Sequence, residues 1–106
     1  MSDVAVAREP APATVRRYGL TLDEWRAILE RQGGVCGVCK KVPPSATLCV
    51  DHEHVRGWGK MSPENRKRHI RGLACFRCNV AMRRGTTVEW LVAATKYLEA
   101  YERRRA

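Results

Sequence analysis

Two Cys-x-x-Cys pairs constrain this chain more than any other feature of its sequence. Cys36 and Cys39 form the first pair, and Cys75 and Cys78 form the second, far apart in a chain of 106 residues. Tetrahedral zinc binds four thiolates at about 2.3 Å, and two such pairs supply them at the usual spacing. Free thiols and redox chemistry are the alternatives. We expect a structural zinc ion that ties two distant segments of a small fold together.

The fifth cysteine and the start of the chain indicate the cellular compartment in which the protein is expected to fold. An odd number of cysteines leaves one without a partner in a disulfide scaffold, and the apolar stretch 4–7 follows the acidic Asp3 rather than forming a secretion signal. No apolar run approaches the roughly 18 residues that cross a bilayer. We expect a single cytoplasmic domain with no membrane partner, in which Cys49 packs in a strand.

The positive charge is concentrated in one segment. The net charge is +9, and residues 56–84 hold nine basic residues against Glu64 alone. Such a patch attracts polyanions, so nucleic acid is the expected partner, and a surface that only keeps the protein soluble is the alternative. The nine basic residues are Arg56, Lys60, Arg66, Lys67, Arg68, Arg71, Arg77, Arg83 and Arg84.

The two ends of the chain differ from its middle. Residues 1–17 are rich in Ala, Pro and Val without helical or strand periodicity, so we expect a flexible arm. Residues 86–106 open with a capping box at Thr86 and Glu89, which predicts a helix to Arg103 that could pair with a copy of itself. We expect one side of this helix to be buried, and its residues are Leu91, Ala94, Thr95 and Leu98. We also expect its aromatic residues to be packing residues and not a binding platform; they are Trp90, Tyr97 and Tyr101.

The middle of the chain, residues 18–85, is expected to be the folded domain. The predicted elements are, in order, a helix over 21–32, a strand over 46–50, a polar loop, a strand over 70–74 and a helix over 76–84. Adjacent strand residues point to opposite faces, so Asp51 and His52 can converge only if the backbone bends. We therefore expect an irregular strand end over 51–54.

Three polar residues near the predicted zinc site carry the chemistry of an active site. Asp51 and His52 follow the first expected strand, and Asn79 follows the last cysteine. A carboxylate and an amide oxygen suit Mg²⁺, and a neighbouring histidine can deprotonate water near neutral pH. Surface decoration is the alternative for an isolated Asp-His pair. Together the three groups suffice for metal-dependent hydrolysis of phosphodiesters.

The chain resembles the recombination endonuclease VII family in four segments that occur in the family's order. They are Tyr18-Gly-Leu-Thr, Gln32-Gly-Gly-Val-Cys36-Gly-Val-Cys39, Val50-Asp51-His52-Glu53-His54 and Ile70-Arg71-Gly72-Leu73-Ala74-Cys75-Phe76-Arg77-Cys78-Asn79. That family belongs to the HNH nucleases. The resemblance implies an α+β, zinc-stabilised ββα-metal (His-Me finger) domain with flanking helices, and the activity of a metal-dependent DNA endonuclease of phage type.

The resemblance also implies a role for each matching residue. Asp51 and Asn79 match the ligands of the catalytic Mg²⁺ or Mn²⁺, His52 matches the general base, and the four paired cysteines match the zinc ligands. The products would carry 5′-phosphate and 3′-hydroxyl ends. The residues expected to contact nucleic acid are His54, Arg56, Lys60, Arg66, Lys67, Arg68, Arg71 and Arg77.

The sequence departs from the family pattern in three places. The stretch 55–69 is longer than the usual turn and contains Trp58, which could stack on a base or cap the hairpin; Met82 stands where some members have an acidic residue. Only one candidate helix follows the nuclease module, so a nicking or non-specific nuclease fits better than a junction-resolving one. A non-catalytic zinc module that binds nucleic acid or protein is the alternative, RNA stays open as a substrate, and a phage enzyme would act in the host cytoplasm.

Overall fold

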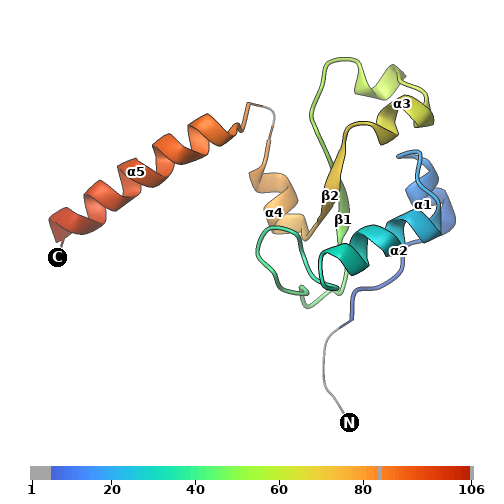
Figure 1. The fold of residues 1–106 in the computed structure, drawn as a ribbon, viewed down its shortest axis with the longest axis horizontal. Coiled ribbons are helices and arrows are strands. Elements are labelled where there is room, and N and C mark those ends of the chain that lie inside the picture. Colours follow the sequence, from blue (N-terminus) through green and yellow to red (C-terminus); the bar gives the residue numbers. More distant parts are fainter. Residues whose placement is uncertain (1–5, 84, 106) are drawn as a thin grey trace, which may run out of the picture.

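The computed structural model describes residues 6–83 and 85–105. A two-stranded antiparallel sheet lies at the centre, formed by β1 (Cys49–His52) and β2 (Ile70–Ala74), and α4 (Phe76–Ala81) follows β2 directly. Helices α1 (Pro12–Arg16) and α2 (Leu22–Arg31) lie on one side of the hairpin (Figure 1). The chain is thus a mixture of helices with one small sheet, which confirms the expected α+β class.

Helix α2 forms where the sequence predicts it. The Thr21 hydroxyl accepts a hydrogen bond from the Glu24 amide at 3.1 Å, and the Glu24 carboxylate accepts one from the Thr21 amide at 3.0 Å. This capping box satisfies two amides that would otherwise lack a partner at the helix start. The helix buries Trp25 and Ile28 against the hairpin side of the molecule.

The core gathers apolar residues from both ends of the domain. Trp25 and Leu73 are almost completely buried, and the first is contributed by α2 and the second by β2. Val15 of α1 is also buried, so the prediction that residues 12–16 lack regular structure was wrong. Pro12 at the start of α1 fixes a helical φ there, and burial of a single valine leaves no periodicity for sequence reasoning to detect.

The stretch 55–69 carries structure of its own rather than forming only a loop. A short 3₁₀ helix, η1 (Trp58–Lys60), is followed by α3 (Pro63–Lys67), whose cap is the Ser62 hydroxyl. Neither helix buries a residue, so the sequence of this stretch has no apolar periodicity from which a helix could be predicted. Strand β1 begins at Cys49, three positions later than expected, and α4 ends at Ala81. Residues 1–5 of the expected arm, Arg84 and Ala106 lie outside the described residues.

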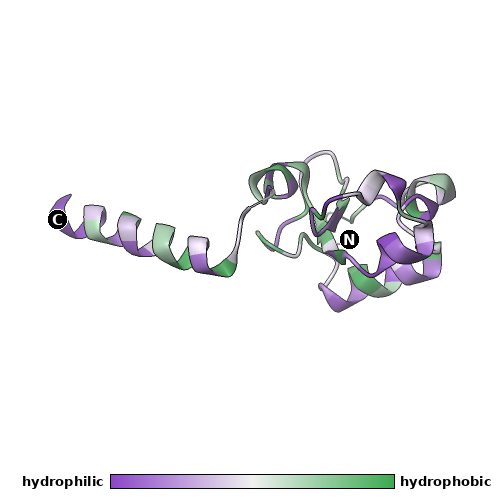
Figure 2. Ribbon diagram, turned by 90° about the horizontal axis from the view of Figure 1, so that it is seen from above, coloured by the Kyte–Doolittle hydropathy of each residue, from purple (hydrophilic) through white to green (hydrophobic). Residues whose placement is uncertain are grey.

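Helix α5 (Val88–Arg105) projects away from the rest of the molecule (Figures 1 and 2). Its first turn is capped by Thr87, whose hydroxyl accepts from the Trp90 amide at 3.0 Å, and not by Thr86. None of its residues is buried, and Leu91 and Leu98 are 45% and 55% exposed. The expectation that this helix packs an apolar side on the domain was therefore wrong. No helix in the described part of the chain is long and apolar enough to span a membrane.

Candidate active site and metal centre

The four paired cysteines meet at one point between the loop after α2 and the start of α4. Their sulfur atoms all lie within 4.8 Å of one another, and Cys39 Sγ is 4.0 Å from Cys75 Sγ. Four thiolates around a tetrahedral zinc ion lie about 3.8 Å apart, given a zinc–sulfur distance of about 2.3 Å. The four cysteines are therefore positioned to bind a metal, as the sequence predicts.

The backbone around the cluster favours thiolate at Cys36. Burial opposes ionisation of this thiol, but the amides of Cys75, Cys39 and Val38 point at its sulfur and lower its pKa to about 6. Metal binding requires deprotonated cysteine, so these amides prepare a ligand. Cys49 lies outside the cluster, where burial raises the pKa of its thiol. Cys49 is therefore the one cysteine that does not belong to the cluster, as its sequence position outside both Cys-x-x-Cys pairs indicates.

Gln32 joins the first cysteine loop to strand β2, a role that sequence reasoning missed. Its side-chain amide donates to the Val35 carbonyl at 2.9 Å and to the Leu73 carbonyl at 3.0 Å. Its oxygen accepts from the Leu73 amide at 2.9 Å. Gln32 thus pairs with the free edge of β2 as another strand would. The only signal in the sequence is its position in the Gln-Gly-Gly-Val-Cys segment.

A bulge interrupts the hairpin between Asp51 and His52. Asp51 pairs with Gly72 and His52 pairs with Ile70, which leaves Arg71 as the extra residue of β2. The predicted irregularity is confirmed at this position. Bulges redirect side chains, and here the bulged residue places a guanidinium beside the neighbouring strand.

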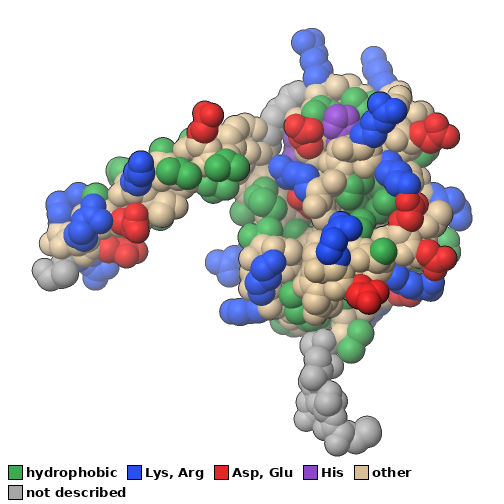
Figure 3. Space-filling view, viewed as in Figure 1, with side chains coloured by type: hydrophobic (Ala, Val, Ile, Leu, Met, Phe, Trp, Pro, Cys, Tyr) green, Lys and Arg blue, Asp and Glu red, His purple; other side chains and the backbone are tan. Residues whose placement is uncertain are grey.

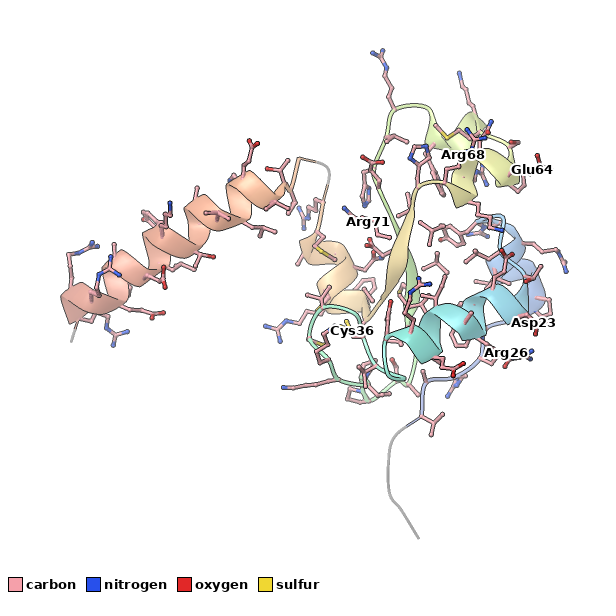
Figure 4. The ribbon with its side chains drawn as sticks, viewed as in Figure 1. Asp23, Arg26, Cys36, Glu64, Arg68 and Arg71 are labelled. Carbon is pink, nitrogen blue, oxygen red and sulfur yellow. The ribbon has the colours of Figure 1, made fainter. Side chains whose placement is uncertain are left out.

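Asp51 is buried and forms a two-fold ion pair with Arg71. Arg71 Nε lies 2.8 Å from one carboxylate oxygen and Arg71 Nη2 lies 2.9 Å from the other. The pair raises the pKa of Arg71. Figure 4 shows Arg71 beside the strands, on the side of α4. An open pocket of about 400 Å³ adjoins the pair, and its lining includes Asp51, Arg71, Gln32 and Met82.

His52 lies in a group of aromatic rings rather than beside the Asp51 carboxylate. Its ring is stacked on Trp58, with centroids 3.9 Å apart and planes at 14°, and His54 lies 4.9 Å away at 23°. Burial lowers the pKa of His52, and the nearby His54 lowers it further. A second pocket, of about 370 Å³, is lined by His52, His54, Arg56 and Trp58 among others. Asp51 and His52 thus line two separate pockets.

Asn79 lies on α4, one residue after the last cysteine of the cluster. Helix α4 packs against both strands, and the Asn79 side chain is half-buried. Within the described residues, no hydrogen bond joins Asn79 to Asp51, whose oxygens are both occupied by Arg71. The structure thus places Asn79 on a helix that packs on both strands, but among the described residues no hydrogen bond joins the two expected ligands, and Asn79 is not in the lining of the pocket beside Asp51.

The basic residues divide into exposed and engaged ones. Arg66 donates to three backbone carbonyls, and Lys67 forms an ion pair with Glu24. His69 contacts the Glu53 carboxylate at 3.1 Å. Figure 3 shows Lys and Arg side chains spread over the visible face of the domain, some of them near the histidine side chains, which are purple. Five of the residues expected to meet nucleic acid are exposed and form no side-chain hydrogen bond or ion pair with the described residues; they are His54, Arg56, Lys60, Arg68 and Arg77.

Comparison with known proteins extends over most of the domain. The family described as recombination endonuclease VII matches residues 12–100. The gene 59 proteins of Mycobacterium phages D29 and L5 are each 38% identical to this chain over 63 residues. That region is 58% of this chain and 32% of each relative, so the match spans about a third of those proteins. No solved structure matches the chain.

Proposed function

Because the chain belongs to the recombination endonuclease VII family, we propose that it is a metal-dependent DNA endonuclease of HNH type. The single observation that carries the proposal is the four-cysteine cluster, which joins the loop after α2 to the start of α4. A zinc ion there would fix α4 against the hairpin, in the strand–strand–helix order of a ββα-metal domain. Asp51 and His52 end the first strand of that unit, and Asn79 lies on its helix.

His52 is the proposed general base. A partly buried imidazole whose pKa is lowered stays neutral near pH 7, which is the form that accepts a proton. His52 would take a proton from water, and the hydroxide would attack phosphorus in line as the bond to the 3′-oxygen breaks. The departing 3′-oxygen takes up a proton from solvent, which leaves 5′-phosphate and 3′-hydroxyl ends. A positioned base contributes about 10²–10⁴ in rate.

Asp51 and Asn79 are the proposed ligands of a catalytic Mg²⁺ or Mn²⁺. Their oxygen donors fit such an ion in chemistry, since hard cations take carboxylate and amide oxygens. The Asp51 carboxylate already requires a positive partner, and Arg71 supplies it here, so Arg71 must turn away before a cation can bind. When bound, the cation would stabilise charge on the phosphate and the leaving oxygen. Arg71, once released, could pair with a phosphate instead.

DNA is the proposed substrate, and the exposed basic residues are its proposed contacts. His54 and Arg56 line the His52 pocket, and Lys60, Arg68 and Arg77 are further exposed basic residues of the domain. Phosphate contacts do not separate DNA from RNA, so RNA is tested alongside. Structure selectivity, for junctions or for nicking, is to be measured on a panel of branched, flapped and linear substrates.

The partner and setting proposed for the protein follow from the exposed helix and the phage relatives. Val88, Leu91 and Val92 line an apolar surface on α5, and a second copy of the helix could cover it as a homodimer. Since the relatives come from phages, we propose that the enzyme acts in the cytoplasm of an infected host cell.

A non-catalytic nucleic-acid-binding zinc module is the second candidate. It is favoured by one observation, the Arg71 guanidinium that occupies both Asp51 oxygens, since a pair this complete could also be a purely structural replacement for a metal. The two functions differ in whether the chain cuts DNA at all.

Nicking of supercoiled plasmid separates the two candidates. Wild type, His52→Ala and Asn79→Ala are compared with Mg²⁺ and with Mn²⁺, and Asn65→Ala serves as the matched control because the Asn65 side chain is exposed on α3. We expect His52→Ala to lose about 10²–10⁴ in rate with DNA affinity retained, and Asn65→Ala to behave as wild type. Uncut plasmid with wild type under every divalent metal would leave only the binding module.

A further inference from the structure

Trp58 is in closer ring contact with His52 than any other described residue. The two centroids are 3.9 Å apart and the planes differ by only 14°, so the rings lie flat on each other. His54 is a second, more distant near-parallel neighbour of the same imidazole. Both nitrogens of an imidazole lie in the plane of its ring. A ring held flat against Trp58 can therefore present its nitrogens only at its edge.

Trp58 is itself held from several directions. The Arg66 guanidinium donates to the Trp58 carbonyl at 3.2 Å and to the Gly59 carbonyl at 2.8 Å, and its carbon lies 5.6 Å from the indole centroid. Tyr18 lies 6.0 Å from the indole, and His69 meets it edge-on at 6.3 Å. A tryptophan this well supported can restrain a neighbour, whereas a mobile one could not.

The support for Trp58 reaches the body of the domain. Arg66 also donates to the Arg17 carbonyl at 3.0 Å, which ties α3 to the turn after α1. Lys67 of the same helix pairs with Glu24 of α2. The long stretch 55–69 is thereby fastened at two points to helices that are already part of the core. Its position relative to His52 is fixed by the fold.

We propose that Trp58 is a positioning residue, which holds the His52 imidazole in the plane that aims its nitrogen at the attacking water. The inference rests on the proposed function of His52 as a base. Rate depends steeply on such placement, and a misplacement of about 1 Å can cost about 10²-fold. Through Trp58, the stretch 55–69 would thus position the proposed catalytic histidine in addition to any contact that it makes with DNA.

The alternative role for Trp58 is to stack on a base of the nucleic acid. One face of the indole is already covered by His52, which leaves less of the ring for a base. A stacking role would appear in affinity, because loss of one base–aromatic stack weakens binding by about 5–150-fold. A positioning role would appear in the rate at saturating DNA. The two roles are therefore separable in one set of variants.

The test compares Trp58→Ala and Trp58→Phe with Trp90→Ala, which removes an exposed tryptophan of α5. Single-turnover cleavage is measured at saturating DNA and Mg²⁺, and affinity is measured with labelled DNA. We expect Trp58→Ala to cleave about 10–100-fold more slowly with affinity within about two-fold. Trp58→Phe, which keeps a flat ring, should recover most of the rate, and Trp90→Ala should match wild type.

Nuclear magnetic resonance of the His52 ring protons supplies a readout independent of cleavage. The indole ring current shifts these protons in the wild type, so Trp58→Ala should move their resonances and Trp58→Phe should move them less. A weakened affinity with an unchanged saturated rate would overturn the proposal in favour of base stacking. Unchanged His52 resonances in Trp58→Ala would overturn it as well. If the wild type cuts no DNA, the proposed function fails, and the resonances alone decide whether Trp58 fixes His52.

Discussion

At the scale of single residues, the Asp51 carboxylate is the clearest case of a charge whose partner is essential. Only 6% of its side chain is exposed, and both oxygens accept from Arg71. A buried carboxylate without a cation is strongly unfavourable, so something positive must stand beside it. Arg71 does so here, and a divalent cation would do so in the proposed active state.

Replacing Arg71 tests this exchange. Arg71→Ala should lower the free energy of unfolding by about 2–3 kcal/mol, less than for a fully buried pair because 36% of the Arg71 side chain is exposed. Saturating Mg²⁺ should restore part of the loss if the ion replaces the guanidinium. Urea denaturation with and without Mg²⁺ measures both effects.

Arg31→Ala is the matched control, because Arg31 lines the same pocket and its side chain is exposed. It should change the free energy of unfolding by no more than about 0.5 kcal/mol. Equal stability of Arg71→Ala and Arg31→Ala would show that the Asp51 carboxylate needs no cation, and the metal-ligand role of Asp51 would lose its physical basis.

The roles of single residues with a distinctive chemistry could be predicted from the sequence. The roles of residues that depend on a partner far away in the chain could not. The cysteine spacing predicted which four thiols gather and which one stays apart. The sequence also located the break in strand regularity at Asp51, although the convergence of Asp51 and His52 from which it was expected does not occur, since the two residues line separate pockets. The Gln32 clamp and the Arg71 pair were missed, since each depends on a partner in a distant segment.

At the scale of elements, helices with their own local signals were predictable. Helix α2 has a capping box and two buried residues on one face, and it forms within a residue of its expected bounds. Helices α1 and α3 have five residues each and were missed, because a helix that short shows no period. Their positions are set by contacts that only the folded chain makes.

Gly19 is the contact point between the turn after α1 and helix α3. Its φ is +78°, and a Cβ at this position would collide with the Pro63 carbonyl at the start of α3. Gly19→Ala should therefore lower the free energy of unfolding by more than about 1 kcal/mol through backbone strain alone, and displace α3 further. The variant should also disturb the His52 resonances, because α3 carries Arg66. Thermal denaturation and resonance shifts measure the two effects.

Gly59→Ala is the control for this substitution, since an added Cβ there meets nothing within 4 Å. Wild-type stability of Gly59→Ala together with a destabilised Gly19→Ala would support the docking of α3. If Gly19→Ala is as stable as Gly59→Ala, the contact between Gly19 and Pro63 does not hold the stretch 55–69 in place.

At the scale of the whole molecule, a metal at the four cysteines is expected to contribute much of the stability. The core is small, and α5 adds nothing to it because none of its residues is buried. Structural zinc contributes about 10–16 kcal/mol in isolated zinc modules, which exceeds what most small domains have in total. The orientation of α5 was not predictable from its sequence, since its apolar residues would suit packing on the domain as well as on another chain.

Removal of the metal should unfold the domain. Chelation should abolish the cooperative thermal transition, and Cys78→Ser should behave as the chelated protein does. Cys49→Ser removes the one cysteine outside the cluster and should keep its transition. Circular dichroism with measured zinc content follows all three samples. A chelated wild type that still melts cooperatively at the same temperature would mean that the cluster is not what holds the fold.

In the proposed active state, one metal at the cysteines holds the fold and a second cation binds between Asp51 and Asn79. Anomalous X-ray diffraction from crystals of the zinc-loaded protein soaked in Mn²⁺ locates both ions directly. We expect a zinc peak among the four cysteine sulfurs and a manganese peak in contact with Asp51 and Asn79, with Arg71 turned away. Strong manganese peaks elsewhere only, with Arg71 still paired to Asp51, would contradict it.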